Sequence, residues 1–74
     1  MRILLTEAGV QAIQDPVRGE GELAELLRNL QANLVGNMLM VSREDYAALQ
    51  RYAATPGGDL EDRARTILEG AQVS

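Results

Sequence analysis

Carboxylates that lie close together in the sequence are the side chains of this chain best suited to chemistry. Asp59, Glu61 and Asp62 fall within four residues, and Glu44 and Asp45 are adjacent. Paired carboxylates can hold Mg²⁺ or transfer protons as general acids and bases. Both groups, however, occupy the first turn of an expected helix, where the positive end of the helix dipole stabilises negative charge. The sequence therefore predicts helix-start carboxylates here and no metal site.

Nucleophilic catalysis has no candidate residue. The chain contains no Cys and no His, and all of its seven basic residues are Arg. Ser42 and Thr6 stand directly before expected helices, and capping accounts for both of them. The glycines near residues 19–21 and 56–58 are not followed by the Lys-Ser/Thr step of a phosphate-binding loop. We therefore expect no enzymatic activity, no catalytic residue and no cofactor.

The elements that would position these side chains are two short strands and four helices. Apolar runs at residues 2–5 and 38–41 predict strands, and two amphipathic helices follow each run. The clearest helix carries a leucine stripe that extends to Leu34. Asp59 is expected to cap the last helix. Residues 71–74 are expected to form a loose tail.

The two halves of the chain resemble each other. Residues match at a spacing of 36 up to the first helix of each half, and at a spacing of 37 in the second helix. The matches include Thr6 and Ser42, Gln14 and Gln50, Leu23 and Leu60, and Arg28 and Arg65. Helix caps and apolar stripes explain the leucine matches, whereas the Gln and Arg matches favour a true duplication. Short i,i+3 and i,i+4 spacings also predict ion pairs of Arg28 with Glu25 and of Arg65 with Glu61.

This layout resembles a class of short, uncharacterised bacterial and prophage-associated proteins with a duplicated motif. Each half of that motif has a strand ending in Thr or Ser, a helix, and a Gly-Gly-aromatic-Gln step into a second helix. The corresponding segments are residues 19–31 (GEGELAELLRNLQ) and 56–68 (PGGDLEDRARTIL). Leu23 and Leu60 replace the aromatic residue, and Ala24 and Glu61 replace the glutamine. The resemblance covers nearly the whole chain and implies a fold, but no activity.

The sequence thus predicts one domain, residues 1–74, of the α+β class and mostly helical. It consists of a duplicated strand–helix–helix unit, with halves at about 1–36 and 37–70. If the duplication holds, a pseudo-twofold axis relates the halves and their two short strands pair antiparallel.

The charge balance narrows the class of partner. The 74 residues include eleven acidic and seven basic side chains, for a net charge of −4. A protein that binds duplex DNA usually presents a basic face, so a protein partner is favoured over direct nucleic-acid binding. The apolar runs are too short to span a bilayer and no signal peptide is recognisable, so we expect no membrane association and a cytoplasmic location.

Nine of the eleven acidic residues are expected at helix starts. Capping preferences account for each one singly, but a pseudo-twofold fold could gather these starts into a negative surface that steers a basic partner. The residues predicted to bind a partner in this way are Glu20, Glu22, Glu44, Asp45, Asp59, Glu61 and Asp62.

The leading functional hypothesis is a small acidic protein-interaction module. By analogy of size and charge with anti-CRISPR proteins, it would be a phage or mobile-element inhibitor that binds a host defence complex. One alternative is a small DNA-binding regulator of the helix-turn-helix type that uses Arg18 and Arg28. Another is a structural or assembly subunit.

Self-association is a further expectation. Met38, Leu39, Met40 and Val41 form an apolar run, and a two-stranded sheet would leave this strand with an open edge. Such an edge could pair with a second copy, which predicts a homodimer with a four-stranded sheet.

Overall fold

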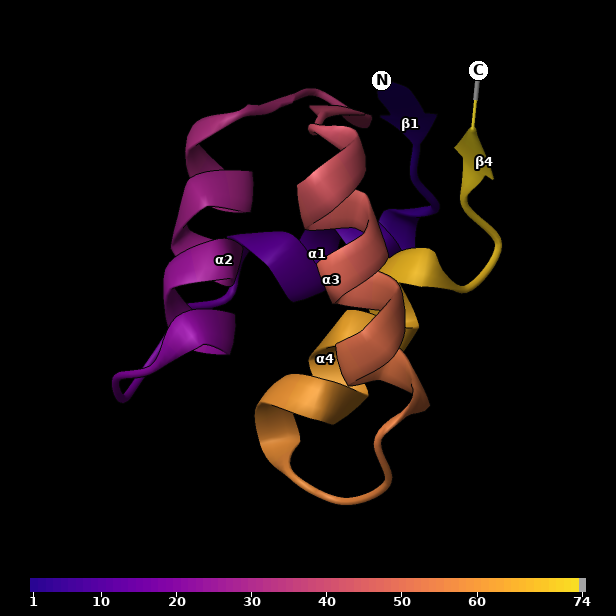
Figure 1. Ribbon diagram of the computed structural model, residues 1–74. Helices are drawn as coiled ribbons and strands as arrows, with labels where there is room; N and C mark the ends of the chain where they lie inside the picture. The colour runs from indigo at the N-terminus through magenta and orange to yellow at the C-terminus, as the bar shows by residue number, and fades with distance from the viewer. Residues whose placement is uncertain (74) are drawn as a thin grey trace.

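The computed structural model describes residues 1–73, which form helices packed on one side of a small antiparallel sheet (Figure 1). The described elements are β1 (Arg2–Leu4), α1 (Glu7–Gln14), α2 (Glu22–Ala32), β2 (Leu34–Val35), β3 (Met38–Met40), α3 (Arg43–Ala54), α4 (Asp59–Leu68) and β4 (Gln72–Val73). This arrangement confirms the predicted mostly helical α+β fold with four helices. The sheet, however, contains two more short strands than we expected.

The strand order β2-β3-β1-β4 interlocks the two halves of the chain. The central pair is β1 with β3, antiparallel, and it places Ile3 opposite Leu39. The outer strands also cross over, because β2 of the first half pairs with β3, and β4 of the second half pairs with β1. Each strand pair in residues 1–73 therefore joins one half to the other.

Equivalent hydrogen bonds in the two halves establish the pseudo-twofold relation. The Leu5 amide donates to the Asn37 carbonyl at 2.9 Å, and 36 residues on, the Val41 amide donates to the Met1 carbonyl at 3.0 Å. The helix caps repeat as well. The Thr6 hydroxyl accepts from the Gly9 amide, and the Ser42 hydroxyl accepts from the Asp45 amide, both at 3.1 Å. These matched bonds support a duplicated unit.

The repeated arginines anchor the segment that follows the first helix of each half. Arg28 donates through Nη2 to the carbonyls of Val17 and Gly19, at 3.5 and 2.7 Å. Arg65 donates to the carbonyls of Ala53 and Thr55, which lie 36 residues after Val17 and Gly19, at 3.2 Å each. The shared contact explains why both halves carry Arg at this position.

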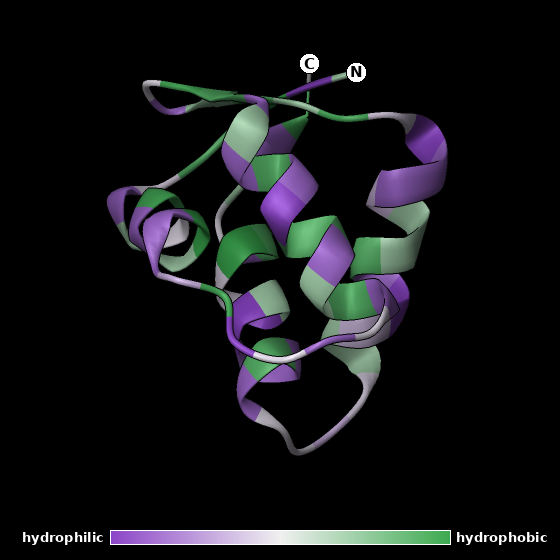
Figure 2. Ribbon diagram, turned by 90° about the vertical axis from the view of Figure 1, so that its left-hand side faces the viewer, coloured by the Kyte–Doolittle hydropathy of each residue, from purple (hydrophilic) through white to green (hydrophobic). Residues whose placement is uncertain are grey.

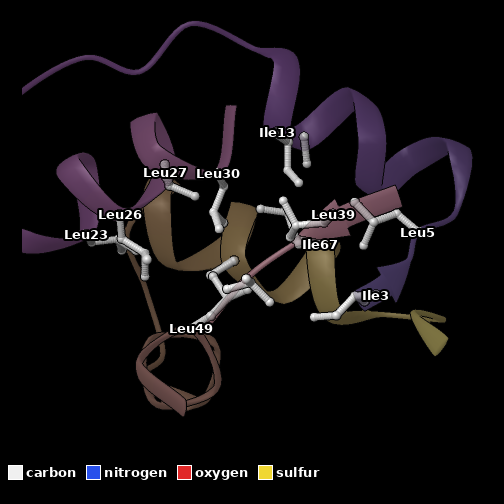
Figure 3. Packing of buried hydrophobic residues seen from close by; sticks show 13 residues of the cluster. Ile3, Leu5, Ile13, Leu23, Leu26, Leu27, Leu30, Leu39, Leu49 and Ile67 are labelled. Carbon is white, nitrogen blue, oxygen red and sulfur yellow. The ribbon is translucent and has the colours of Figure 1, made fainter. Parts of the chain in front are cut away.

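The core is built from matched pairs of apolar side chains that converge between the sheet and the helices (Figure 3). Both members of each pair are almost fully buried, so the interior of one half continues into the other. The pairs are Ile3 with Leu39, Ile13 with Leu49, Leu27 with Ala64, and Leu30 with Ile67. Burial of large apolar side chains is the main source of stability for a short chain without disulfides.

The two halves differ in how closely their second helices pack. Helix α4 lies tightly against α1 and α3, whereas α2 contacts its neighbours more sparsely and stands apart in Figure 1. Gly9 of α1 allows the close approach, because a Cβ there would lie 3.4 Å from the Ile67 carbonyl oxygen. The equivalent of Gly9 in α3 is Asp45. Similarly, Leu27 of α2 stands where α4 has the smaller Ala64, so equivalent positions of the two halves differ in side-chain size.

Three predictions about the strands were wrong. Leu34 belongs to β2 rather than to the preceding helix, because the chain turns back through Gly36, with φ +62°, and Asn37. Residues 72–73 of the expected loose tail pair with β1, while Ser74 lies outside the described residues. The run 38–41 is not at an open edge, since β3 is flanked by β2 and β1.

Three predictions about local contacts were also wrong. Gly58, not Asp59, is the N-cap of α4, and its φ of +83° is a conformation that favours glycine. Gly21 has the same role for α2, with φ +118°. Arg65 pairs with Asp62 at 2.7 Å instead of with Glu61, and Arg28 is used to anchor a loop.

Replacing Gly70 with Ala should destabilise the fold more than the same change at Gly19. Both glycines have positive φ, +74° and +92°, so each change carries backbone strain of about 1–2 kcal/mol. At Gly70 the new Cβ would also lie 2.8 Å from Thr6 Cγ2, whereas nothing lies within 4 Å at Gly19. The Thr6 side chain is held by its capping bond and cannot easily move. Urea unfolding of both variants measures the difference, and equal losses of stability would contradict this packing argument.

Candidate protein-binding surfaces

The predicted partner-binding carboxylates lie in two regions rather than on one continuous face. Glu20, Glu22 and Glu61 border one open hollow, where the N-terminal ends of α2 and α4 meet. Asp59 lines a neighbouring hollow, and Asp62 is engaged by Arg65. The remaining two, Glu44 and Asp45, lie in the first turn of α3, close to the sheet. The structure thus brings the acids of α2 and α4 together and leaves those of α3 apart.

The space between α2 and α3 is a groove that connects these two regions. Asn29 and Asp45 line both the middle part of the groove and its end next to the sheet, so the two parts are continuous. The groove lies where α2 and α3 contact each other only sparsely. Its lining comprises Glu22, Glu25, Leu26, Asn29, Asp45, Ala48, Arg51 and Tyr52 in the middle, and Met1, Leu30, Asn33, Met40, Val41 and Ser42 near the sheet.

One hydrogen bond crosses this groove at the end away from the sheet. The Tyr52 hydroxyl of α3 donates to Glu22 Oε2 of α2 at 3.1 Å. The pKa of the Tyr52 phenol is raised above its ordinary value of 10.0. The largest cause is partial burial, and the hydrogen bond to Glu22 and the negative charge of Glu22 add to it. The contact links the first half of the chain to the second and fixes the width of the groove at this point.

The face of the sheet that points away from the helices carries exposed apolar side chains. Directly opposite residues of an antiparallel pair share a face, so the strand registers place Val35, Met38 and Leu4 in one row across three strands. Met40 and Arg2 form a second row beside them. The exposed fractions are 74% for Val35, 45% for Met40 and 38% for Leu4. We call these five residues the outer face; the ribbon in Figure 2 shows the helices gathered on the other side of the sheet.

The outer face is adjacent to the groove. Met40 belongs to both, since it also lines the end of the groove near Asn33 and Asp45. Within residues 1–73 the large apolar side chains with the greatest exposure, Met1, Leu4, Val35, Met40 and Val73, all belong to the sheet or its first neighbour. An apolar area rimmed by polar and acidic groups is typical of a protein-binding surface.

Neither Arg28, one of the two arginines predicted to read DNA, nor the acidic clusters form another kind of site. The guanidinium of Arg28 is engaged with the loop carbonyls of Val17 and Gly19, which argues against a role in reading DNA. In the described part of the chain, no group of three or more carboxylates is placed to hold a metal ion. None of the helices in residues 1–73 is both long and apolar enough to cross a membrane.

Sequence reasoning missed the outer face and the apolar part of the groove. Val35 follows the leucine stripe of an expected helix, and Leu4 was expected only as part of a short strand. One signal for the groove was present in the sequence, since Asp45 occupies the repeat position of Gly9. A difference in size at a duplicated position indicates that the two halves do not pack in the same way.

No protein-family model, curated protein or solved structure matches this chain.

Removing the Glu22 carboxylate should lower the pKa of Tyr52 only in part. We expect Glu22→Ala to remove the hydrogen bond and the charge but to leave the partial burial, so the phenol should titrate below its wild-type pKa and still above its ordinary value. The Tyr46→Phe background leaves Tyr52 as the remaining tyrosine, and tyrosinate absorbance then reports it directly.

The sign of the pH effect on stability follows from the same shift. A raised folded-state pKa favours the neutral phenol, so the contact contributes stability at neutral pH that is lost as the pH rises through the folded-state pKa. Glu20→Gln is the matched control and should leave the Tyr52 titration unchanged. An unchanged pKa in Glu22→Ala would show that the contact does not form in solution.

Proposed function

We propose that this chain is a protein-interaction module that acts by binding alone. The observation that carries the proposal is the outer face, where Val35, Met40 and Leu4 expose apolar area that no helix covers. Methionine side chains adapt their shape to a partner, and both Met38 and Met40 belong to this face. The outer face would therefore form the apolar centre of the interface.

The adjoining groove supports a particular chemistry for the partner. Glu22, Glu25 and Asp45 line it, and Arg51 is the cation beside them. A partner with apolar side chains flanked by Arg or Lys would place its apolar part on the outer face and its basic part toward these carboxylates. The net charge of −4 would assist its approach through long-range attraction.

Complexes that handle nucleic acid expose basic surfaces of this kind. We therefore propose to test first whether this chain inhibits such a complex, as an anti-CRISPR-like factor of a phage or mobile element would. A binding-only inhibitor needs a surface and no catalytic group, which fits the side chains available in this sequence. The helix-turn-helix alternative has less support, because α2 carries Glu22 and Glu25, and Arg28 is engaged with a loop.

The test compares capture of host proteins by the wild type and by surface variants of it. We expect the double variant Val35→Gln/Met40→Gln to retain its fold, since both side chains are exposed, and to bind the captured partner at least tenfold more weakly. Glu25→Arg should also weaken binding and should reduce its dependence on salt, because it removes one carboxylate from the groove.

The matched control is Glu69→Arg, which makes the same charge change at an exposed residue after α4 and outside the groove. It should bind as the wild type does. If the double variant binds as tightly as the wild type, the outer face is not the binding surface. If Glu69→Arg weakens binding as much as Glu25→Arg, only overall charge matters and the groove does not select the partner.

A further inference from the structure

The two halves of the chain can be viewed as two partners joined by a short turn. Every strand pair in residues 1–73 connects one half to the other, as does the close packing of α1 against α4. Gly36 and Asn37 alone separate β2 from β3. A half by itself would therefore have both of its strands unpaired.

We propose that the chain binds a second copy of itself by exchanging halves. The first half of one copy would pack on the second half of the other, and the reverse, with the turn between β2 and β3 opened. All contacts between halves are then made again between copies, because the two copies have the same surfaces. Each half of one copy therefore binds the complementary half of the other copy.

The strand register shows that opening the turn leaves a continuous ladder. Leu34 lies opposite Leu39, and Val35 lies opposite Met38. If two copies extend through Gly36 and Asn37 and keep this register, Gly36 of one copy falls opposite Asn37 of the other. The opened segments of both copies would then pair along their whole length, adding backbone hydrogen bonds that the turn cannot make.

Opening the turn requires a change at Gly36, which as a glycine can adopt both backbone conformations without strain. Gly36 has φ +62° in the closed form and would become extended in the exchanged form. The remaining cost is the loss of freedom when two molecules become one, so the exchanged dimer is favoured at high concentration. Exchange of identical elements is a known route to dimers, and the connection between the halves consists of two residues that can extend within the ladder.

Self-association by exchange of halves differs from the edge pairing of β3 that we first expected. β3 cannot pair through a free edge, because it lies inside the sheet. In the exchanged dimer the same residues, Met38 to Met40, would pair with β1 and β2 of the second copy. The outer face described above would remain exposed in either form, so the proposal does not depend on the proposed function.

The first experiment changes the length of the turn in the full chain. Deleting Gly36 and Asn37 prevents the hairpin from closing, so we expect a folded dimer of twice the 8.0 kDa chain mass by light scattering. A short Gly-Ser insertion between these two residues is the control, and it should yield a monomer. A folded monomer after the deletion would overturn the proposal. An unfolded deletion variant would also overturn it, because exchange should rescue the fold.

The second experiment distinguishes exchange from association of intact surfaces. Ile13→Asp and Leu49→Asp each place a charge at a buried position in a different half, and each chain alone should be unfolded. When both chains are refolded together, the intact half of one can pack on the intact half of the other. We expect about half of the wild-type helical signal to return, because one of the two packed units is intact. A mixture that stays as unfolded as its components would contradict half exchange.

Discussion

The antiparallel pair of β1 and β3 is the contact on which the rest of the fold depends. At its centre Ile3 and Leu39 face each other, and both are fully buried beneath the helices. A chain of 74 residues without disulfides has little apolar area to bury, so it needs a core to which both halves contribute. The outer strands pair across the same boundary, while the matched caps fix the helix starts and the arginine anchors fix the loops of each half. The halves therefore form one cooperative unit.

The departures from symmetry create the surfaces on which a partner could bind. Gly9 and Ala64 lie where α4 packs closely, whereas the larger Asp45 and Leu27 stand at the equivalent positions in the half where α2 packs more sparsely. The result is a groove with acidic side chains on one side of the molecule. The sheet has helices on one of its faces only, and the apolar outer face lies next to this groove.

Much of the fold could be predicted from the sequence, because its signals are local. Thr6 and Ser42 precede amphipathic stretches, and the 36-residue spacing indicated a duplication whose central strands pair antiparallel. The strands β2 and β4 could not be predicted, since two residues are too few to show an alternating pattern. Their pairing is decided by the opposite half. Likewise, no local pattern indicates that Arg28 donates to backbone carbonyls of the preceding loop. The candidate surfaces depend on helix spacing and strand order. For that reason the sequence indicated only their acidic residues and the run from Met38 to Val41, which we expected at an open edge and not on an outer face.

Native-state hydrogen exchange tests the central claim that the two halves form one interlocked unit. The most informative amides are those of Leu5 and Val41, which make equivalent bonds to Asn37 and Met1 across the boundary between halves, together with those of β1 and β3. If the halves stabilise each other as described, β1 and β3 should open with the same free energy, equal to that of global unfolding. If one strand exchanges through a separate opening of lower free energy while the other stays protected, the halves fold independently and the account is wrong.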